Sequence, residues 1–179
     1  MPKVGGSDQK TEVSDRDYRR ISRFLFDEAE LFEDKDYQTW LGRVMPDISY
    51  RMPVRGVFEK GEQPKQKFTN GYFDEDFDSL VLRTTLWAKA STTVAESPPS
   101  ITRHFVTNIR AYDSEEAGSF EVTSNVLVFR IRSTSTVHHL FSCRRNDRIC
   151  EVDGELRLAS RLVIMDEPVV QSPNLSFLV

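Results

Sequence analysis

The stretch PPSITRHFVTNI, residues 98–109, marks the point where the expected structure changes from helix to sheet. Pro98 and Pro99 exclude a helix here, because a proline nitrogen cannot donate a hydrogen bond and each proline disfavours helix at the residue before it. The residues that follow alternate as in a strand. Most of the chain before this stretch is expected to be helical, and nearly all of it afterwards to be strand. The stretch also holds His104, whose role decides between a catalytic and a structural function.

Composition indicates an ordinary globular protein. The chain has 179 residues, of which 39% are hydrophobic and 29% charged, enough for one domain with a substantial core. A net charge of −4 argues against nucleic-acid binding. No apolar run approaches the roughly 20 residues that cross a bilayer, and the N-terminus lacks an apolar signal segment. Cys143 and Cys150 are the only cysteines, so no disulfide framework is expected. We expect a cytoplasmic protein without membrane contact.

The first half predicts a short arm and three helices. Residues 1–13 are polar and read as a flexible arm, and residues 14–179 as a single domain. Ser14 can cap a helix, and the apolar face of that helix consists of Tyr18, Ile21, Leu25, Ala29 and Phe32. The other face of the helix is charged and is expected to face solvent. A shorter helix capped by Asp34 or Asp36 runs to Pro46, and a third opens at Asp74 or Asp76.

The segments between and after these helices predict a sheet. Residues 48–54 alternate as a strand, and Pro53 places it at an edge or breaks its pairing. Residues 56–73 read as a long surface loop and residues 91–99 as a linker. Strands are expected at 101–110, 119–132, 136–149 and 156–165, with a hairpin turn at Asp153-Gly154. Short connections imply a mostly antiparallel sheet. The fold class is therefore α+β, with N-terminal helices packed on one face of a curved, cone-like sheet.

The candidate chemical groups are few. His138 and His139 are adjacent in a strand, point to opposite faces and cannot share a metal in regular geometry, so no metal site is expected. His104 could act as a general base with Asp47 or Tyr50, but no carboxylate lies at a fixed spacing from it, which favours a structural histidine. The thiol of Cys143 could be activated by neighbouring arginines, although an ordinary strand cysteine is favoured. The arginines Arg144, Arg145 and Arg148 suit carboxylate pairing across an interface.

Several ordered motifs together resemble a known family. They are FLFDEAEL at 24–31, residues 37–41, DISYRMPVR at 47–55, PPSITRHFVTN at 98–108, RRND at 144–147 and NLSF at 174–177. Over residues 18–179 they resemble the small (β) subunit of bacterial aromatic-ring-hydroxylating dioxygenases, and most closely members that act on hydrocarbons such as biphenyl or naphthalene. The chain departs from many members by ending in Leu178-Val179 rather than in phenylalanines.

The resemblance implies a cone-like fold shared with nuclear transport factor 2 and scytalone dehydratase. It implies an α3β3 hexamer in which β subunits contact large (α) subunits and other β subunits. The large subunit would carry a Rieske [2Fe–2S] cluster and a mononuclear Fe(II), receive electrons from NADH through a ferredoxin and a reductase, and perform cis-dihydroxylation with O2. The small subunit would be mainly structural, with its cone pocket filled or unused, so catalytic, cofactor-binding and metal residues are not expected in this chain.

We therefore predict a non-catalytic β subunit whose functional residues form subunit interfaces. These residues are Arg103, His104, Asn108, Arg144, Arg145, Asn174, Leu175 and Phe177. One alternative is a stand-alone cone-fold dehydratase or isomerase that uses His104 as general base. Another is a homo-oligomeric binding module without chemistry.

Overall fold

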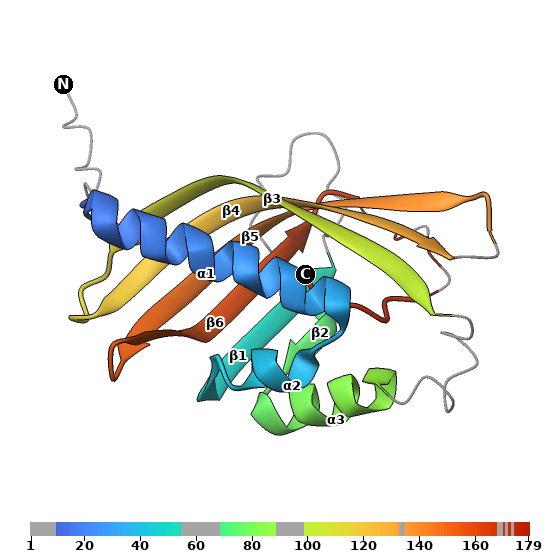
Figure 1. The fold of residues 1–179 in the computed structure, drawn as a ribbon, viewed down its shortest axis with the longest axis horizontal. Helices are drawn as coiled ribbons and strands as arrows, with labels where there is room; N and C mark the ends of the chain where they lie inside the picture. The colour runs from blue at the N-terminus through green and yellow to red at the C-terminus, as the bar shows by residue number, and fades with distance from the viewer. Residues whose placement is uncertain are drawn as a thin grey trace.

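The computed structural model describes residues 10–54, 69–88, 99–132, 135–167, 170, 172 and 174–179. A long helix lies across the concave face of a twisted sheet, and two shorter helices lie at one end of it (Figure 1). Along the chain the elements are α1 (Asp15–Asp34), α2 (Tyr37–Leu41), β1 (Val44–Val54), β2 (Thr69–Glu75), α3 (Phe77–Ala88), β3 (Ser100–Asp113), β4 (Ser119–Arg132), β5 (His138–Val152) and β6 (Glu155–Met165). The expected α+β class is confirmed.

The three helices begin where the sequence predicts. Ser14 caps α1, since its hydroxyl accepts a hydrogen bond from the backbone N–H of Asp17 at 3.1 Å. Asp36 caps α2 and Asp76 lies before α3, each accepting a backbone hydrogen bond three residues on, at 3.1 and 2.9 Å. Helix α2 is shorter than predicted because Val44 already belongs to β1. No helix within the described residues is long and apolar enough to cross a membrane.

The sheet has the strand order β2-β1-β6-β5-β4-β3. Every neighbouring pair is antiparallel except β1 and β6, which run parallel, so the expected mostly antiparallel sheet is confirmed. Strand β1 is an inner strand, and its pairing with β2 shifts register on both sides of Pro53. Of the two alternatives for Pro53, the break in pairing is therefore the correct one.

Strand β2 corrects the prediction of a loop over residues 56–73. An Asn-Gly pair such as Asn70-Gly71 favours a turn in isolation, but here Gly71 lies opposite Pro53 where β1 and β2 shift register. A Cβ atom at residue 71 would lie 2.6 Å from the backbone oxygen of Met52, so a glycine is needed for this close approach of two strands. The remainder of the predicted loop, and most of the predicted linker at 91–99, lie outside the described residues.

The turn between β5 and β6 has the backbone conformation that its sequence predicts. Asp153 and Gly154 turn with φ of 53° and 83°, as expected for the β5–β6 hairpin.

The described part of the predicted N-terminal arm pairs with β3. The backbone N–H of Val13 donates to the backbone oxygen of Ala111, and the backbone N–H of Asp113 donates to that of Thr11. Residues 11–13 therefore belong to the folded domain, and residues 1–9 lie outside the described part.

The core lies between α1 and the concave face of the sheet. Helix α1 contributes its apolar face, with Ile21 and Leu25 fully buried. The last three residues, Phe177, Leu178 and Val179, are also buried in this space, and the Phe177 ring lies 4.9 Å from that of Phe141 on β5. The cone is thus closed from inside by its own C-terminal segment.

Candidate functional site

Four charged side chains meet at the centre of the cone. We call Glu28 on α1, Arg145 and Asp147 on β5, and Arg161 on β6 the buried charge cluster. Both terminal nitrogens of Arg161 donate to the Glu28 carboxylate, at 2.9 and 2.8 Å, and Arg161 also makes two 2.9 Å bonds to Asp147. Arg145 donates to Glu28 at 3.0 Å. Since each charge faces an opposite one, the burial of four ionic groups becomes tolerable.

Strand and helix periodicity place these groups inside. Arg145 and Asp147 have the same strand parity as the buried Cys143 and Ile149. Glu28 lies on the buried face of α1, three residues after Leu25 and four before Phe32. These spacings are the signal that could identify Glu28 from sequence, although a glutamate is not one of the apolar residues from which the buried helix face was predicted.

The electrostatics of the cluster keep Glu28 and Arg161 ionised. Burial alone would raise the pKa of Glu28, but the Arg161 and Arg145 guanidiniums outweigh burial and hold that pKa below its ordinary value. Burial likewise opposes the charge of Arg161, yet Asp147 and Glu28 raise its pKa well above the ordinary value. Glu28 and Arg161 are therefore both stabilised in their charged forms by the opposite charges around them.

The C-terminal segment is bonded to the same cluster. The hydroxyl of Tyr50 donates to the backbone oxygen of Val179 at 2.7 Å and accepts from the N–H of Val179 at 3.1 Å. Arg161 donates to the same backbone oxygen at 3.2 Å, and the indole N–H of Trp40 donates to Glu28 at 2.9 Å. Burial raises the pKa of Tyr50 to about 12. These contacts fill the space at the centre of the cone, between α1 and the sheet.

His104 lies inside the cone and contacts the same segment. Its Nε2 is 2.9 Å from the backbone oxygen of Leu178, and its ring lies 5.5 Å from that of Phe32. The Nδ1 atom has no hydrogen-bond partner. Burial lowers the pKa of His104, which favours the neutral ring. The alternative that pairs His104 with Asp47 finds no support, since Asp47 is exposed on β1 and the His104 ring is bonded to Leu178. The geometry supports a structural histidine over the general-base alternative.

The other groups considered for chemistry lie apart. Burial raises the pKa of Cys143 to about 12, which opposes a reactive thiolate. His138 is exposed and stacked on Phe129, whereas His139 lies against Phe141, consistent with opposite faces of a strand. Within the described residues, no three His, Cys, Asp or Glu side chains come together as metal ligands.

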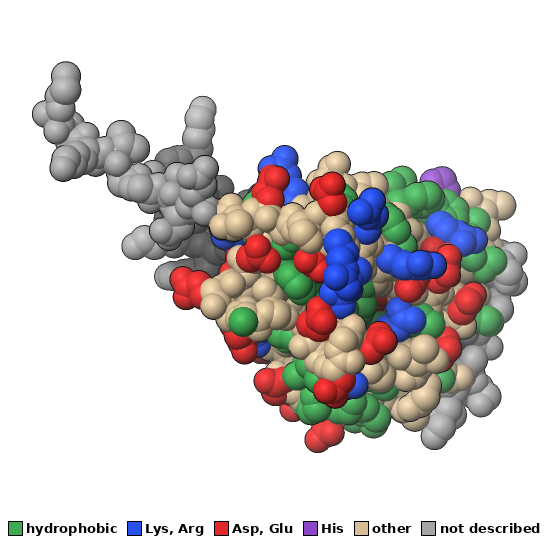
Figure 2. Space-filling view, turned by 60° about the vertical axis from the view of Figure 1, so that its left-hand side comes forward, with side chains coloured by type: hydrophobic (Ala, Val, Ile, Leu, Met, Phe, Trp, Pro, Cys, Tyr) green, Lys and Arg blue, Asp and Glu red, His purple; other side chains and the backbone are tan. Residues whose placement is uncertain are grey.

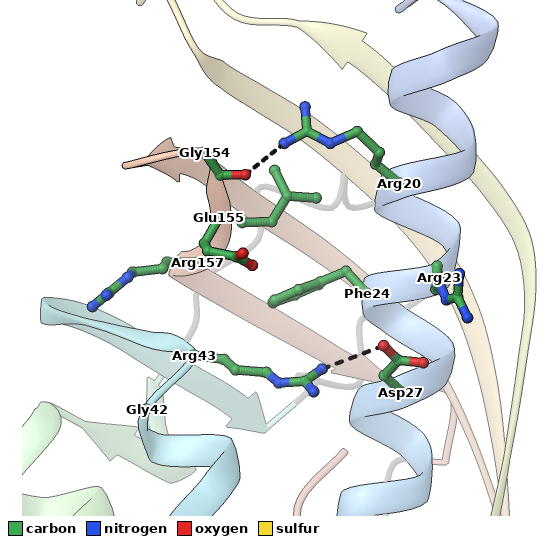
Figure 3. A pocket seen from close by; sticks show the side chains of 10 residues that line it. Arg20, Arg23, Phe24, Asp27, Gly42, Arg43, Gly154, Glu155 and Arg157 are labelled. Atoms are coloured by element: carbon green, nitrogen blue, oxygen red, sulfur yellow. Dashed lines mark hydrogen bonds and ion pairs between the residues drawn. The ribbon is translucent and has the colours of Figure 1, made fainter.

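A shallow pocket opens between α1 and the β5–β6 hairpin (Figure 3). Phe24 points into it, Arg20 donates to the backbone oxygen of Gly154 at 3.1 Å, and Arg43 lies 3.6 Å from Asp27. Basic side chains form a band flanked by acidic ones on this side of the molecule (Figure 2). Two guanidiniums at this pocket, those of Arg20 and Arg43, are thus already paired within the chain.

The outer face of the sheet carries exposed apolar side chains. The outer apolar patch is defined by Ile101, Phe105, Leu127 and Leu140, which are 55%, 50%, 39% and 51% exposed. Phe105 lies opposite Leu127 in the β3–β4 register, and Phe129 lies opposite Leu140 in the β4–β5 register. Exposed apolar patches of this kind are typical of protein interaction sites, so this face is a candidate interface.

The structure divides the eight predicted interface residues into two groups. Arg103, Asn108 and Arg144 are exposed on β3 and β5, and Arg103 forms an ion pair with Glu33. The others have contacts inside the chain: His104, Arg145 and Phe177 are buried, while Asn174 and Leu175 are half-buried. The second group supports the core and the C-terminal segment. Packing within the chain therefore accounts for these residues in the motifs at 98–108, 144–147 and 174–177.

Asn174 shows how the second group is held. The buried Arg130 on β4 donates to the backbone oxygen of Asn174 at 2.8 Å and to its side-chain oxygen at 2.5 Å. Arg130 also donates to the hydroxyl of Ser172 at 2.7 Å. The NLSF motif is therefore anchored to the sheet immediately before the chain enters the cone.

Comparison with known proteins places these features in a family. The family model described as the ring hydroxylating beta subunit matches residues 27–172. The beta subunit of benzene 1,2-dioxygenase from Pseudomonas putida is 28% identical over 162 residues, covering 88% of this chain and 86% of the relative. The beta subunit of biphenyl 2,3-dioxygenase from Rhodococcus jostii (strain RHA1) is 30% identical with the same coverage.

Solved structures share the fold. A structure of naphthalene 1,2-dioxygenase with indole bound in the active site matches with a TM-score of 0.84 and 23% identity, covering 96% of this chain and 90% of that chain. A candidate scytalone dehydratase from Novosphingobium aromaticivorans matches with a TM-score of 0.61 and 15% identity, covering 85% of each chain. The expected cone-like fold is confirmed. With a family model that matches most of its length, this chain belongs to the β subunits of the aromatic-ring-hydroxylating dioxygenases.

Proposed function

We propose that this chain is a structural β subunit that holds large oxygenase subunits in an α3β3 hexamer. In this proposal the large subunit carries the Rieske [2Fe–2S] cluster and the mononuclear Fe(II), receives electrons from NADH through a ferredoxin and a reductase, and cis-dihydroxylates an aromatic hydrocarbon in the cytoplasm. The relatives act on benzene and biphenyl by name, which supports an aromatic hydrocarbon as the substrate class.

The occupied cone interior is the observation that carries this proposal. A cone-fold enzyme needs an open pocket with a base facing it. Here the buried charge cluster and residues 177–179 fill the centre, and Tyr50 and His104 are both bonded to the backbone of that segment. The dehydratase alternative is correspondingly less supported.

The outer apolar patch is the surface proposed to contact the large subunit. It combines exposed aromatic and aliphatic side chains with the polar residues Arg103, Asn108 and Arg144 around it, as in an interface with an apolar centre and a polar rim. Asn174 and Leu175, which are half-buried, remain candidates for a smaller contribution.

Co-expression with the large subunit tests the proposal. We expect the unmodified chain to co-purify with it in a complex that forms cis-dihydrodiols, and the chain alone to have no turnover. Phe105→Asp should abolish co-purification, because a charge would be buried in the patch. Leu82→Asp is the matched control, since Leu82 is 63% exposed on α3, away from the patch.

Two outcomes would contradict the proposal. One is turnover of a substrate by the chain alone that is lost in His104→Ala while the fold is retained, as the dehydratase alternative requires. The other is full assembly of the Phe105→Asp variant with the large subunit. Circular dichroism of each variant alone verifies that the substitutions leave the fold intact.

A further inference from the structure

The regular pairing of β3 and β4 is interrupted on the outer face of the sheet. Thr107 lies opposite Asn125, but the next pair joins Arg110 to Thr123, so Asn108 and Ile109 together face one residue of β4. This is a β-bulge, and Asn108 adopts a left-handed backbone with φ of 51°. Bulges change the direction of side chains, and asparagine tolerates this backbone conformation better than most residues.

The bulge forms one side of an open pocket of about 510 Å³. The opposite side is built by β4 and β5, where Asn125 lies opposite Arg144 in the register. The pocket is therefore surrounded by hydrogen-bond donors: the guanidiniums of Arg110 and Arg144 and the side-chain amides of Asn108 and Asn125. None of the described residues that line it is acidic.

Both arginines are available for an external partner. Arg110 and Arg144 are exposed, and no ion pair within the described residues involves either of them. This distinguishes the pocket from the one beside Phe24, where Arg20 and Arg43 already contact carboxylates. A pair of guanidiniums with neighbouring amides matches a carboxylate, because arginine presents parallel N–H donors to its two oxygens.

The position of the pocket indicates the source of that carboxylate. Thr107 and Asn125 pair at its edge, directly beside the Phe105–Leu127 pair of the outer apolar patch. A macromolecule that covers the patch would therefore also cover the pocket. We propose that the pocket receives an aspartate or glutamate side chain of the large subunit; this inference rests on the proposed function and adds the chemistry of one contact.

Assembly measurements on two arginine variants test the inference. The large subunit is titrated with the unmodified chain, Arg144→Gln, Arg110→Gln and the double variant, and the dissociation constant is measured at low and high salt. We expect each single variant to bind about tenfold more weakly and the double variant about a hundredfold more weakly, with a flatter salt dependence. Arg19→Gln removes an exposed arginine from α1 and is expected to bind like the unmodified chain.

A second measurement locates the contact directly. Hydrogen exchange of the complex is expected to show protection at residues 107–110 that is absent in the isolated chain, and reduced protection there in the double variant. Equal unfolding midpoints of all variants exclude a folding defect as the cause of weaker assembly.

The outcomes separate the two proposals. If the unmodified chain fails to bind the large subunit, the proposed function and this inference are both overturned. If it binds and the double variant binds equally well, only the inference is overturned. Binding of acetate by the isolated chain that leaves assembly unchanged at saturation would assign the pocket to a small anion, and arginine-dependent self-association would assign it to a second copy; either result overturns the inference.

Discussion

Glu28 on α1 and Arg161 on β6 form a two-bond ion pair in the core, with nitrogen–oxygen distances of 2.8 and 2.9 Å. Both side chains are almost completely excluded from solvent. The pair joins the helix to the centre of the sheet, and Arg145 and Asp147 complete the balance of charge around it. Such a buried pair adds little net stability, since the desolvation of the ions offsets much of their attraction, but removing one partner alone leaves a buried charge without compensation.

Glu28→Gln should destabilise the chain by about 3 kcal/mol or more, because it leaves two buried guanidiniums facing one remaining carboxylate. Urea unfolding measures the change in the free energy of unfolding. Glu30→Gln is the matched control on the exposed side of the same helix and is expected to stay within about 0.5 kcal/mol of the unmodified chain. Equal stability of the two variants would contradict an energetic role for the cluster.

Acidification should destabilise the chain partly through His104. Burial lowers the pKa of His104 in the folded chain, although the Leu178 backbone oxygen acts in the opposite direction. The unfolded chain takes up a proton as the pH falls through about 6.5, whereas the folded chain resists protonation until lower pH, so the free energy of unfolding decreases below that value. Unfolding of His104→Gln between pH 8 and pH 5 should show a shallower decrease than the unmodified chain.

His138→Gln serves as the reference for this experiment, because His138 is exposed on β5. This variant is expected to follow the pH dependence of the unmodified chain. A His104→Gln variant with the same pH dependence as both would show that His104 is not the buried titrating group.

Cys143 should resist alkylation in the folded chain. Burial raises the pKa of its thiol to about 12, so the thiolate that reacts is scarce at pH 8 and is also enclosed. Peptide mass spectrometry after iodoacetamide treatment should find Cys143 modified only when denaturant is present. Complete modification under native conditions, within the time that labels a free peptide thiol, would disprove the buried position.

Gly71→Ala should destabilise the chain by about 1–3 kcal/mol, because the new Cβ would lie 2.6 Å from the Met52 backbone oxygen and force β1 and β2 apart. Gly42→Ala is the milder comparison, since its Cβ would meet only the Thr39 oxygen at 3.3 Å, and a change within about 0.5 kcal/mol is expected. Thermal unfolding followed by circular dichroism distinguishes them. A larger loss at residue 42 would contradict the close strand approach at residue 71.

Local sequence patterns predicted the elements that depend on local physics. The capping residues Ser14 and Asp36 mark real helix starts, and Asp153-Gly154 makes the turn that its backbone preference indicates. Strand β2 was missed because an Asn-Gly pair favours a turn in isolation, whereas here the pairing partner Pro53 and the shift in register decide the conformation. Pro53 lies 18 residues before Gly71, so the sequence around Gly71 does not show that the two residues pair.

The site was predicted only in part for the same reason. Arg145 was recognised as an arginine that needs a carboxylate, but its partner Glu28 lies 117 residues earlier and belongs to this chain rather than to a partner subunit. The local sequence shows that an arginine needs an opposite charge, but it does not show which carboxylate provides that charge. The family resemblance predicted the class of function, but it did not show whether the carboxylate belongs to this chain or to a partner subunit.

The distance between Glu28 and Arg161 along the sequence, 133 residues, has a consequence for biosynthesis. Helix α1 leaves the ribosome long before β5 and β6 are made, and its buried carboxylate has no counter-charge until then. The parallel partner of β1 is the last strand of the sheet, and the three residues that fill the cone are translated after it. The core can therefore close only after β6 and residues 177–179 have been synthesised.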